Sequence, residues 1–268
     1  MTSPGPPDVL ALDFDGVLCE GTREYFETSR RTCARVWPDR PRADDALLAG
    51  FRALRPVIET GWEMPVLLDA LVRGVPRDAL LGAWPAERDA LLERDPRGRP
   101  RVIALLKTTL DDVRRAWIAA DGDDWVSRHA LYCPRDVVRR VVGAPARTII
   151  VTTKEGEFAR RILEHWSIAV DGIEGKEAGS HKCDNLRQLR SAFQAAAGRA
   201  ATLWFVEDRL ETLSCVRSHR DLDDVRLFLA AWGYNTPAAR EAARRAQGID
   251  LLTLDAFAGP FAGWGAGG

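Results

Sequence analysis

Two aspartates separated by one residue, Asp13 and Asp15, follow a short apolar segment and are themselves followed by Gly16. On an extended chain, residues two apart point to the same side, so these two carboxylates crowd one spot. Such a pair needs either a proton on one carboxyl or a cation between the two. Gly16 lets the chain turn sharply away from the strand. The alternative is an Asx-type turn with a solvated acidic pair.

The aspartates must be positioned by the segments around them, and five short apolar runs are typical of buried parallel strands. These runs span residues 9–12, 148–151, 202–206, 225–229 and 249–252. Helical patterns separate the later runs, at residues 156–166, 183–197 and 236–246. This alternation of strands and helices predicts an α/β fold built on a doubly wound parallel sheet.

The stretch from about residue 20 to 145 breaks the alternation, because it has one helical pattern after another. In the helix predicted at 102–120, one face carries Val102, Leu105, Leu106, Leu110, Val113 and Trp117. We therefore predict a core domain of residues 1–19 and 146–268, with an inserted all-helical cap domain of residues 20–145. An insert placed directly after a strand would lie over the carboxyl edge of the sheet, where open α/β sheets bind ligands.

The apolar segment followed by Asp-x-Asp-Gly-Val, residues 13–17, resembles the first signature of the haloacid dehalogenase (HAD) superfamily of phosphotransferases. The second signature of that family is an apolar strand ending in Ser or Thr, and Thr152 matches it. The following Thr153-Lys154 is similar to phosphoglycolate-phosphatase-like members, and so is Trp232-Gly233-Tyr234 further along. The resemblance covers about residues 8–18 and 146–255, and the helical insert stands where C1-type caps occur, although it is longer than usual.

The third signature is a lysine at or near the start of a helix, and two lysines compete for this part. Lys182 is followed by Leu186 and Leu189 at helical spacing, whereas Lys176 stands in a Gly-rich connector. We predict Lys182 as the family's lysine. Such a lysine would screen the crowded carboxylates and hold a phosphate as a point charge.

The fourth signature is an acidic residue or pair directly after a strand, which Glu207-Asp208 matches. The resemblance implies a metal site formed by Asp13, Asp15, Asp208 and Glu207. Carboxylate oxygens at strand ends suit Mg²⁺, which the family uses as its cofactor. Each signature alone also fits solvated acids, a strand-ending threonine or a surface lysine, and it is their order along the chain that favours a site.

The chemistry implied by the resemblance is phosphoryl transfer through an aspartyl-phosphate. Asp13 would attack phosphorus as the nucleophile, and Asp15 would protonate the leaving oxygen and later deprotonate the attacking water. Thr152, Thr153 and Lys182 would bind the phosphate of the substrate. Family members that cleave carbon–halogen or carbon–phosphorus bonds lack an aspartate at the position of Asp15, so its presence argues for phosphate esters.

We therefore expect an enzyme, a Mg²⁺-dependent HAD-type phosphoric monoester hydrolase that acts on a small phosphorylated metabolite. Two alternatives stay open at this point. One is a phosphomutase of the same fold, which would return the phosphoryl group to its substrate. The other is a protein without enzymatic activity that binds a partner or metabolite on the same scaffold.

The composition excludes several other classes of protein. The 268 residues are 46% hydrophobic and 29% charged, which is enough for a sizeable folded core. With 38 basic and 39 acidic residues, the chain has no general basic field for nucleic acid. The sequence contains no run of 18 apolar residues, so no membrane span is predicted.

Cysteine and histidine usage indicates a cytoplasmic protein without a metal motif. The five cysteines include no Cys-x-x-Cys pair, which fits reduced thiols better than a disulfide framework or a zinc ribbon. The histidines share no recognisable metal spacing either. The cysteines are at positions 19, 33, 133, 183 and 215, and the histidines at 129, 165, 181 and 219.

Overall fold

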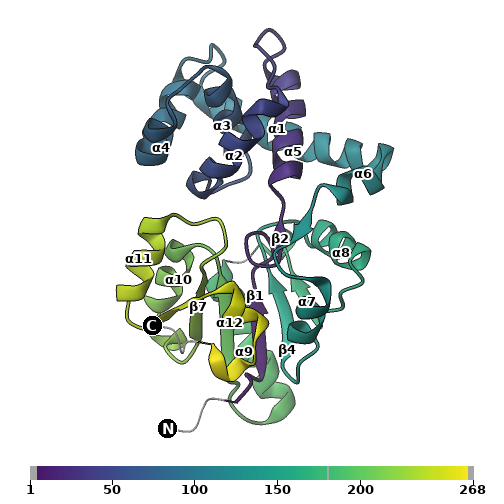
Figure 1. The fold of residues 1–268 in the computed structure, drawn as a ribbon, viewed down its shortest axis with the longest axis vertical. Coiled ribbons are helices and arrows are strands. Elements are labelled where there is room, and N and C mark those ends of the chain that lie inside the picture. Colours follow the sequence, from purple (N-terminus) through teal and green to yellow (C-terminus); the bar gives the residue numbers. More distant parts are fainter. Residues whose placement is uncertain (1–4, 180, 265–268) are drawn as a thin grey trace. The chain divides into compact units, whose positions relative to one another are not determined.

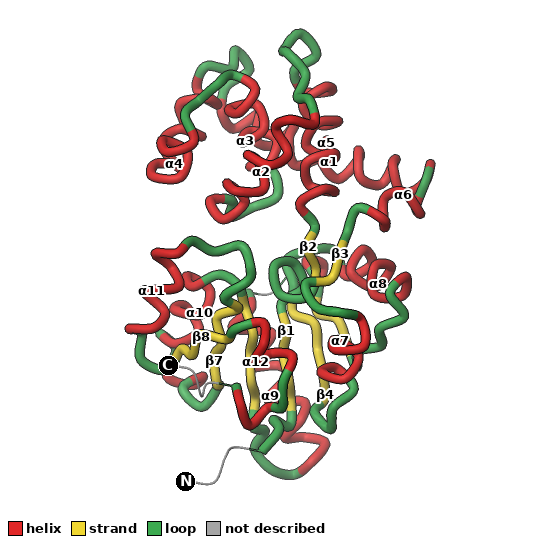
Figure 2. The backbone as a smooth tube through the Cα atoms, in the orientation of Figure 1, coloured by secondary structure: helices red, strands yellow, loops and turns green. Residues whose placement is uncertain are grey.

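The computed structural model describes residues 5–179 and 181–264. Its chain divides into two compact units, which we treat separately. The first unit comprises Met1–Glu20 and Ala130–Gly268, and the second comprises Gly21–His129. Figure 1 shows the first unit as the one that holds the large sheet, and Figure 2 shows the second as built from helices and loops.

A six-stranded sheet forms the centre of the first unit, and every neighbouring pair in it is parallel. The strand order is β5-β4-β1-β6-β7-β8. The strands are β1 (Val9–Leu12), β4 (Arg147–Val151), β5 (Gly172–Glu174), β6 (Leu203–Glu207), β7 (Arg226–Ala230) and β8 (Ile249–Leu252). The predicted fold class is therefore confirmed, and the five predicted strands are present with bounds shifted by at most one residue.

Edge strand β5 was not predicted, because its residues lie in the segment interpreted as a Gly-rich connector. Its sequence, Gly-Ile-Glu, contains a single apolar side chain and so offers no apolar run to recognise. It is a strand because its backbone pairs with β4 over Ile149–Val151. Pairing of this kind depends on the neighbouring strand rather than on the local sequence.

Helices cover both faces of the sheet, which explains why its strands are apolar on successive positions. On one face, Val9 and Ala11 share a core cluster with Leu186 of α9 and Leu213 of α10. On the other face, Trp204 and neighbouring rings pack against Trp264 near the end of the described chain. The helices of this unit are α7 (Arg135–Val142), α8 (Gly156–His165), α9 (Lys182–Ala197), α10 (Leu210–Arg217), α11 (Pro237–Arg245) and α12 (Leu254–Ala258).

Residues 130–145 belong to the sheet-containing unit, which corrects the predicted end of the insert at residue 145. Strand β3 (Ala130–Leu131) pairs with β2 (Cys19–Glu20), so the chain leaves and re-enters this unit through one antiparallel pair. Helix α7 packs against α12, and Arg140 donates to the carbonyl of Ala258 at 2.8 Å. The sequence has a helical pattern at residues 134–142, where α7 lies, but a local pattern does not say which unit its apolar face packs against.

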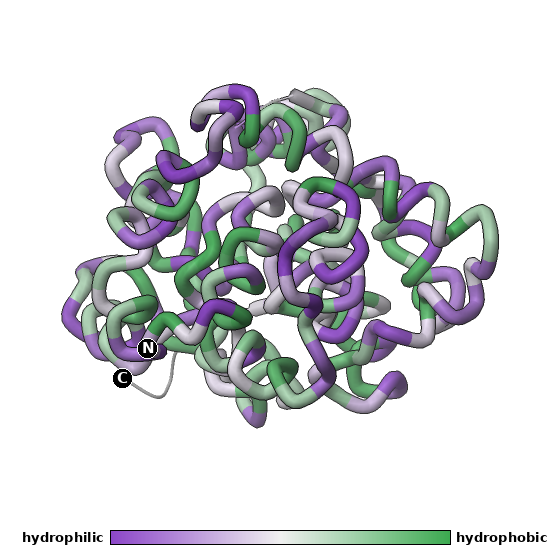
Figure 3. The backbone as a smooth tube through the Cα atoms, turned by 90° about the horizontal axis from the view of Figure 1, so that it is seen from above, coloured by the Kyte–Doolittle hydropathy of each residue, from purple (hydrophilic) through white to green (hydrophobic). Residues whose placement is uncertain are grey.

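The second unit contains α1 (Thr22–Val36), α2 (Leu48–Leu54), α3 (Glu63–Val72), α4 (Arg77–Glu93), α5 (Arg99–Ala120) and α6 (Gly122–Ser127). In Figure 3, hydrophobic and hydrophilic stretches alternate along the helices, as expected when each helix buries one face. The buried face of α5 includes Val102 and Trp117, as predicted, but Leu105 is 39% exposed. At about 100° per residue, Leu105 falls roughly 60° outside the stripe formed by the other apolar residues of this helix.

A buried ion pair organises the core of the helical unit. The carboxylate of Glu24 is fully buried and accepts hydrogen bonds from Thr28, Arg114 and Trp125. The Arg114 guanidinium contacts both carboxylate oxygens, at 2.7 and 3.2 Å. These bonds tie α1 to α5 and α6 at a point that is cut off from water.

No helix in the described part of the chain is both long enough and apolar enough to cross a lipid bilayer.

Candidate active site

The three central strands bring the predicted residues to one edge of the sheet. Strand β1 lies between β4 and β6, with Leu12 in register with both Ile150 and Val206. The residues that follow these parallel strands therefore emerge together at the carboxyl edge. They are Asp13 after β1, Thr152 after β4, and Glu207-Asp208 at the end of β6.

The loop after β1 holds Asp13 in place through backbone groups. The Asp13 amide continues the ladder by donating to the carbonyl of Val206 at 2.9 Å. The amide of Phe14 donates to Asp13 Oδ1 at 2.8 Å. Gly16 then takes a positive φ of 91°, which turns the chain away from the sheet. Asp13 is only 7% exposed as a result.

Lys182 is the first residue of α9, and its ammonium lies between two carboxylates. Its Nζ is 3.1 Å from Asp13 Oδ1 and also donates to Glu207 Oε2. Glu207 is fully buried, and its Oε1 accepts the amide hydrogens of Asp208 and Arg209. Both oxygens of Glu207 are thus engaged, so this side chain holds Lys182 beside Asp13.

The cluster has more buried acids than its one lysine can balance. Burial raises the pKa of Asp13 to about 7, and the charge of Glu207 adds to this while Lys182 opposes it. Burial also raises the pKa of Glu207 to about 7, again against the effect of Lys182. Burial would lower the pKa of Lys182, but the charges of Asp13 and Glu207 raise it above its ordinary value. A proton or a further cation is required at this point.

The donor set fits a hard divalent cation. Carboxylate oxygens of Asp13, Glu207 and Asp208 all lie within 4.8 Å of one another, and all three residues are buried. Oδ1 of Asp15 is buried as well and has no hydrogen-bond partner among the described residues. Oxygen donors of this kind are those that Mg²⁺ prefers.

Asp208 is seated by the loop after β7. The amide of Tyr234 donates to Asp208 Oδ2 at 2.7 Å, and the side-chain amide of Asn235 donates to the Asp208 carbonyl at 3.0 Å. Glycines provide the room for this contact. A Cβ on Gly233 would lie 2.3 Å from Cβ of Asp208, and one on Gly16 would lie 2.0 Å from its Oδ2.

Two residues of this arrangement were not predicted as site residues. Lys154 is buried, and its Nζ is 3.3 Å from Asp15 Oδ2. Its position two residues after Thr152, in a chain with four lysines, was the available signal. Asn235 had no signal beyond its neighbours Trp232-Gly233-Tyr234, of which Trp232 donates to the carbonyl of Val17 at 3.0 Å.

The remaining predicted residues differ in their surroundings. Thr152 is 5% exposed, and its hydroxyl oxygen accepts the amide hydrogen of Lys154 at 3.1 Å. Thr153 is exposed, and among the described residues its side chain makes no bond to the cluster. Lys176 lies apart from Asp13, with its Nζ 4.0 Å from Glu155 and its side chain 55% exposed.

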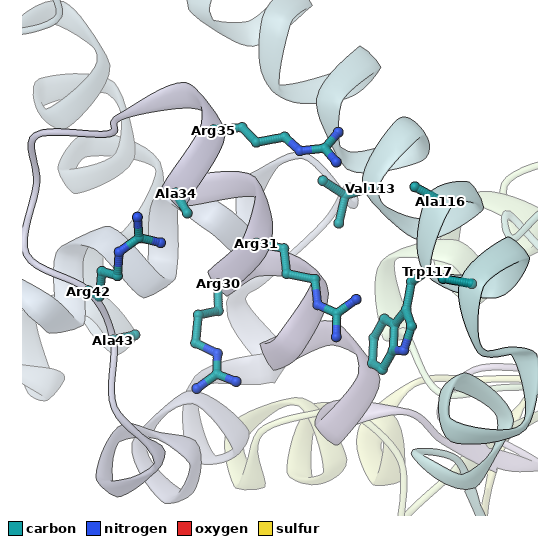
Figure 4. Close-up of a pocket in the computed structure, with 10 residues that line it drawn as sticks. Arg30, Arg31, Ala34, Arg35, Arg42, Ala43, Val113, Ala116 and Trp117 are labelled. Atoms are coloured by element: carbon teal, nitrogen blue, oxygen red, sulfur yellow. The ribbon is translucent and has the colours of Figure 1, made fainter.

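A separate hollow of about 500 Å³ lies within the helical unit. Figure 4 shows that Arg30, Arg31, Arg35 and Arg42 surround it, with Trp117 forming part of its wall. The Arg31 guanidinium is 4.0 Å from the centre of the Trp117 ring. This hollow is basic, in contrast to the acidic edge of the sheet.

No protein-family model matches the sequence, and no curated protein is similar enough to match it. Solved structures do match the fold. One is described as a phosphatase from Clostridium difficile, with 11% identity, a TM-score of 0.59, and coverage of 94% of this chain and 97% of that chain.

Two further structures match over similar lengths. A predicted phosphoglycolate phosphatase from Haemophilus somnus has 13% identity and a TM-score of 0.57, over 94% of this chain and 95% of that chain. A haloacid dehalogenase-like family hydrolase from Streptococcus pneumoniae has 16% identity and a TM-score of 0.54, over 95% of each chain. Identities this low establish the fold alone, so this chain shares with these structures an α/β core that carries a helical insertion.

Proposed function

We propose that this protein is a Mg²⁺-dependent phosphatase that hydrolyses a small phosphorylated metabolite through an aspartyl-phosphate. The observation that carries the proposal is the buried cluster in which Lys182 contacts Asp13 and Glu207 while Asp208 completes the acidic group. A scaffold protein needs none of these buried charges, each of which opposes folding unless it is compensated. The solved structures that match this fold are described as phosphatases or hydrolases, which supports the same assignment.

In the first step, an oxygen of Asp13 attacks phosphorus and the ester bond to the leaving oxygen breaks. A carboxylate that approaches a phosphate meets charge repulsion, and Lys182 lowers it from a position 3.1 Å from Asp13. Glu207 keeps the ammonium there by accepting its hydrogen bond. Thr152 and Thr153 follow β4 directly, and their hydroxyl groups would donate hydrogen bonds to the phosphoryl oxygens.

Asp15 would provide the acid and base of the reaction. It gives a proton to the leaving oxygen as the ester bond breaks, and it takes a proton from the water that then attacks the aspartyl-phosphate. The products are the alcohol and inorganic phosphate, and Asp13 is restored. Lys154, 3.3 Å from Asp15 Oδ2, orients this carboxyl and leaves Oδ1 available for the reacting oxygen.

Asp13 and Asp208 would hold Mg²⁺, together with the backbone carbonyl of Asp15. When bound, the ion would neutralise charge on the phosphoryl oxygens and on the crowded carboxylates. We place Glu207 beside Lys182 rather than among these ligands, because both of its oxygens already accept hydrogen bonds.

The proposal is tested by phosphate release from an aryl phosphate, measured with Mg²⁺ and with EDTA. Metal-dependent release by the wild-type chain, and its loss in Asp13→Asn, is the expected result. Asp136→Asn is the matched control, because Asp136 is exposed in the first turn of α7. Equal release by Asp13→Asn and the wild-type chain would overturn the assignment.

A second candidate function, anion binding by the helical unit, is favoured by the arginine-lined hollow. Among the described residues, neither Arg35 nor Arg42 pairs with an acidic side chain, whereas Arg30 and Arg31 pair with Glu27. Calorimetric titration with pyrophosphate should show binding that Arg35→Ala and Arg42→Ala weaken. Unchanged binding in both variants would rule out this role.

A further inference from the structure

Three side chains of metal-ligating type meet on the sheet-containing unit, and none of them is among the carboxylates of the candidate active site. They are His181, just before α9, Cys183 in its first turn, and Cys215 near the end of α10. This cluster has no recognisable sequence motif, since the cysteines are 32 residues apart and the histidine precedes the helix. The packing of α9 against α10 brings them together.

The sulfur–sulfur distance in the cluster matches the edge of a tetrahedral metal site. The Sγ atoms of Cys183 and Cys215 are 3.9 Å apart, and one donor atom of each of the three residues lies within 4.8 Å of the others. Two thiolates on a tetrahedral zinc ion, with Zn–S bonds of about 2.3 Å, have their sulfurs about 3.8 Å apart. The two cysteines therefore already have the separation that an ion would require.

The neighbouring groups support this geometry. Nδ1 of His219 lies 2.8 Å from the carbonyl oxygen of Cys215, to which it donates when protonated, and it is 3.9 Å from Cys183 Sγ. His219 thus fixes the backbone beside one ligand. Cys183 is buried, Cys215 is partly buried and His181 is exposed, so an ion can reach the cluster from solvent.

The chemistry of the donors selects the kind of ion. Thiolate sulfur and imidazole nitrogen favour zinc and similar borderline ions over Mg²⁺, which takes oxygen ligands. Successive residues of a helix point about 100° apart, so Lys182 directs its side chain to the acids while its neighbour Cys183 faces α10. The two sites are therefore separate in both position and ligand type.

A disulfide is the other bond that two neighbouring cysteines can form. Both thiols are free, and their sulfur atoms are 3.9 Å apart, well beyond the length of an S–S bond of about 2.05 Å. Forming the disulfide would require an oxidant, whereas metal binding requires only the loss of the thiol protons.

We propose that His181, Cys183 and Cys215 bind one Zn²⁺ ion, which links the start of α9 to the end of α10 and leaves a fourth position for water. The site does not depend on the proposed phosphatase activity.

Cobalt titration of the reduced protein tests this proposal without reference to activity. One equivalent of Co²⁺ should produce the thiolate-to-cobalt charge-transfer absorption, and Zn²⁺ should displace it. Cys183→Ser and Cys215→Ser should each reduce or abolish this absorption. Cys33→Ser is the matched control, because Cys33 is a partly buried cysteine in the other unit, with its thiol 3.3 Å from the carbonyl of Pro65.

His181→Ala provides a variant whose folding is not in question, since His181 is exposed. It should weaken Co²⁺ binding at least tenfold, and it should reduce the shift in melting temperature produced by Zn²⁺. The proposal is overturned if the wild-type protein shows no thiolate absorption with Co²⁺. It is also overturned if His181→Ala binds Co²⁺ as tightly as the wild-type protein and the Cys33→Ser control do.

Discussion

At the scale of single residues, the position of one ammonium distinguishes the two lysines that compete in the sequence. Lys182 lies between Asp13 and Glu207, whereas Lys176 is exposed beside Glu155. Removing a preorganised charge from a phosphoryl-transfer site typically lowers kcat by about 10²–10³. Lys182→Ala should show a loss of this size in aryl-phosphate hydrolysis, and Lys176→Ala should not. The assignment is wrong if the two variants behave in the opposite way.

The buried acids also predict how stability depends on pH when no metal is present. The pKa of Asp13 is raised to about 7 in the folded chain, against about 4 in an unfolded chain. The folded state therefore binds the proton more tightly. The stability that Asp13 contributes is fully present below about pH 4 and is lost as the pH rises through about 7.

Urea unfolding in EDTA measures this effect as a difference between two chains. The unfolding free energy of the wild-type chain minus that of Asp13→Asn should fall between about pH 4 and pH 7 and then level off, because asparagine does not titrate. The same difference for Asp136→Asn should stay flat over that range. A constant difference for Asp13→Asn would show that its carboxyl has an ordinary pKa.

At the scale of elements, the loop after β7 holds Asp208, the residue that directly follows β6. Gly233 packs against Asp208, and a Cβ there would lie 2.3 Å from Cβ of Asp208 and 2.5 Å from the carbonyl oxygen of Gly16. Gly233→Ala must therefore move the backbone that holds this acid. Overpacking of this kind destabilises a protein by about 1–3 kcal/mol. We also expect weaker Mg²⁺ binding.

Gly263→Ala is the matched control for this variant, because no atom lies within 4 Å of the Cβ it would add. Both variants can be compared by urea unfolding and by Mg²⁺ titration of the melting temperature. Equal stability and equal Mg²⁺ response in the two would contradict the proposed role of this loop.

At the scale of the whole molecule, each unit has its own core, so damage to one should be local. Glu24 is the buried acid of the helical unit, and Arg114 pairs with it at 2.7 Å. Removing one partner of a buried pair leaves an uncompensated charge and costs about 3–5 kcal/mol. Glu24→Ala should increase hydrogen exchange throughout residues 21–129.

The same variant should leave exchange in strands β1, β4 and β6 unchanged, because these belong to the other unit. Glu241→Ala is the control, since Glu241 is an exposed acid paired with Arg244 and Arg245. Faster exchange across the central strands of Glu24→Ala would show that the two units do not unfold independently.

Much of this architecture could be predicted from the sequence, because apolar runs and helical stripes are local signals. The central strands and α9 were found in this way. Edge strand β5 was not found, and neither was the unit to which α7 belongs, since both depend on what the segment packs against. Asp13, Asp15 and Asp208 follow apolar strands and were recognisable. Lys154, Asn235 and the Cys183–Cys215 cluster are brought to their partners only by tertiary packing.

The central claim is that Asp13 carries the phosphoryl group during turnover, and trapping that intermediate tests it most directly. In Asp15→Asn, an aryl phosphate still provides a good leaving group, but the base that activates water is gone. Intact-mass measurement of this variant with Mg²⁺ and aryl phosphate should show one added phosphoryl group, located on Asp13 by peptide analysis. Aryl-phosphate cleavage by the wild-type chain, with no phosphoryl group ever found on Asp13, would contradict the account.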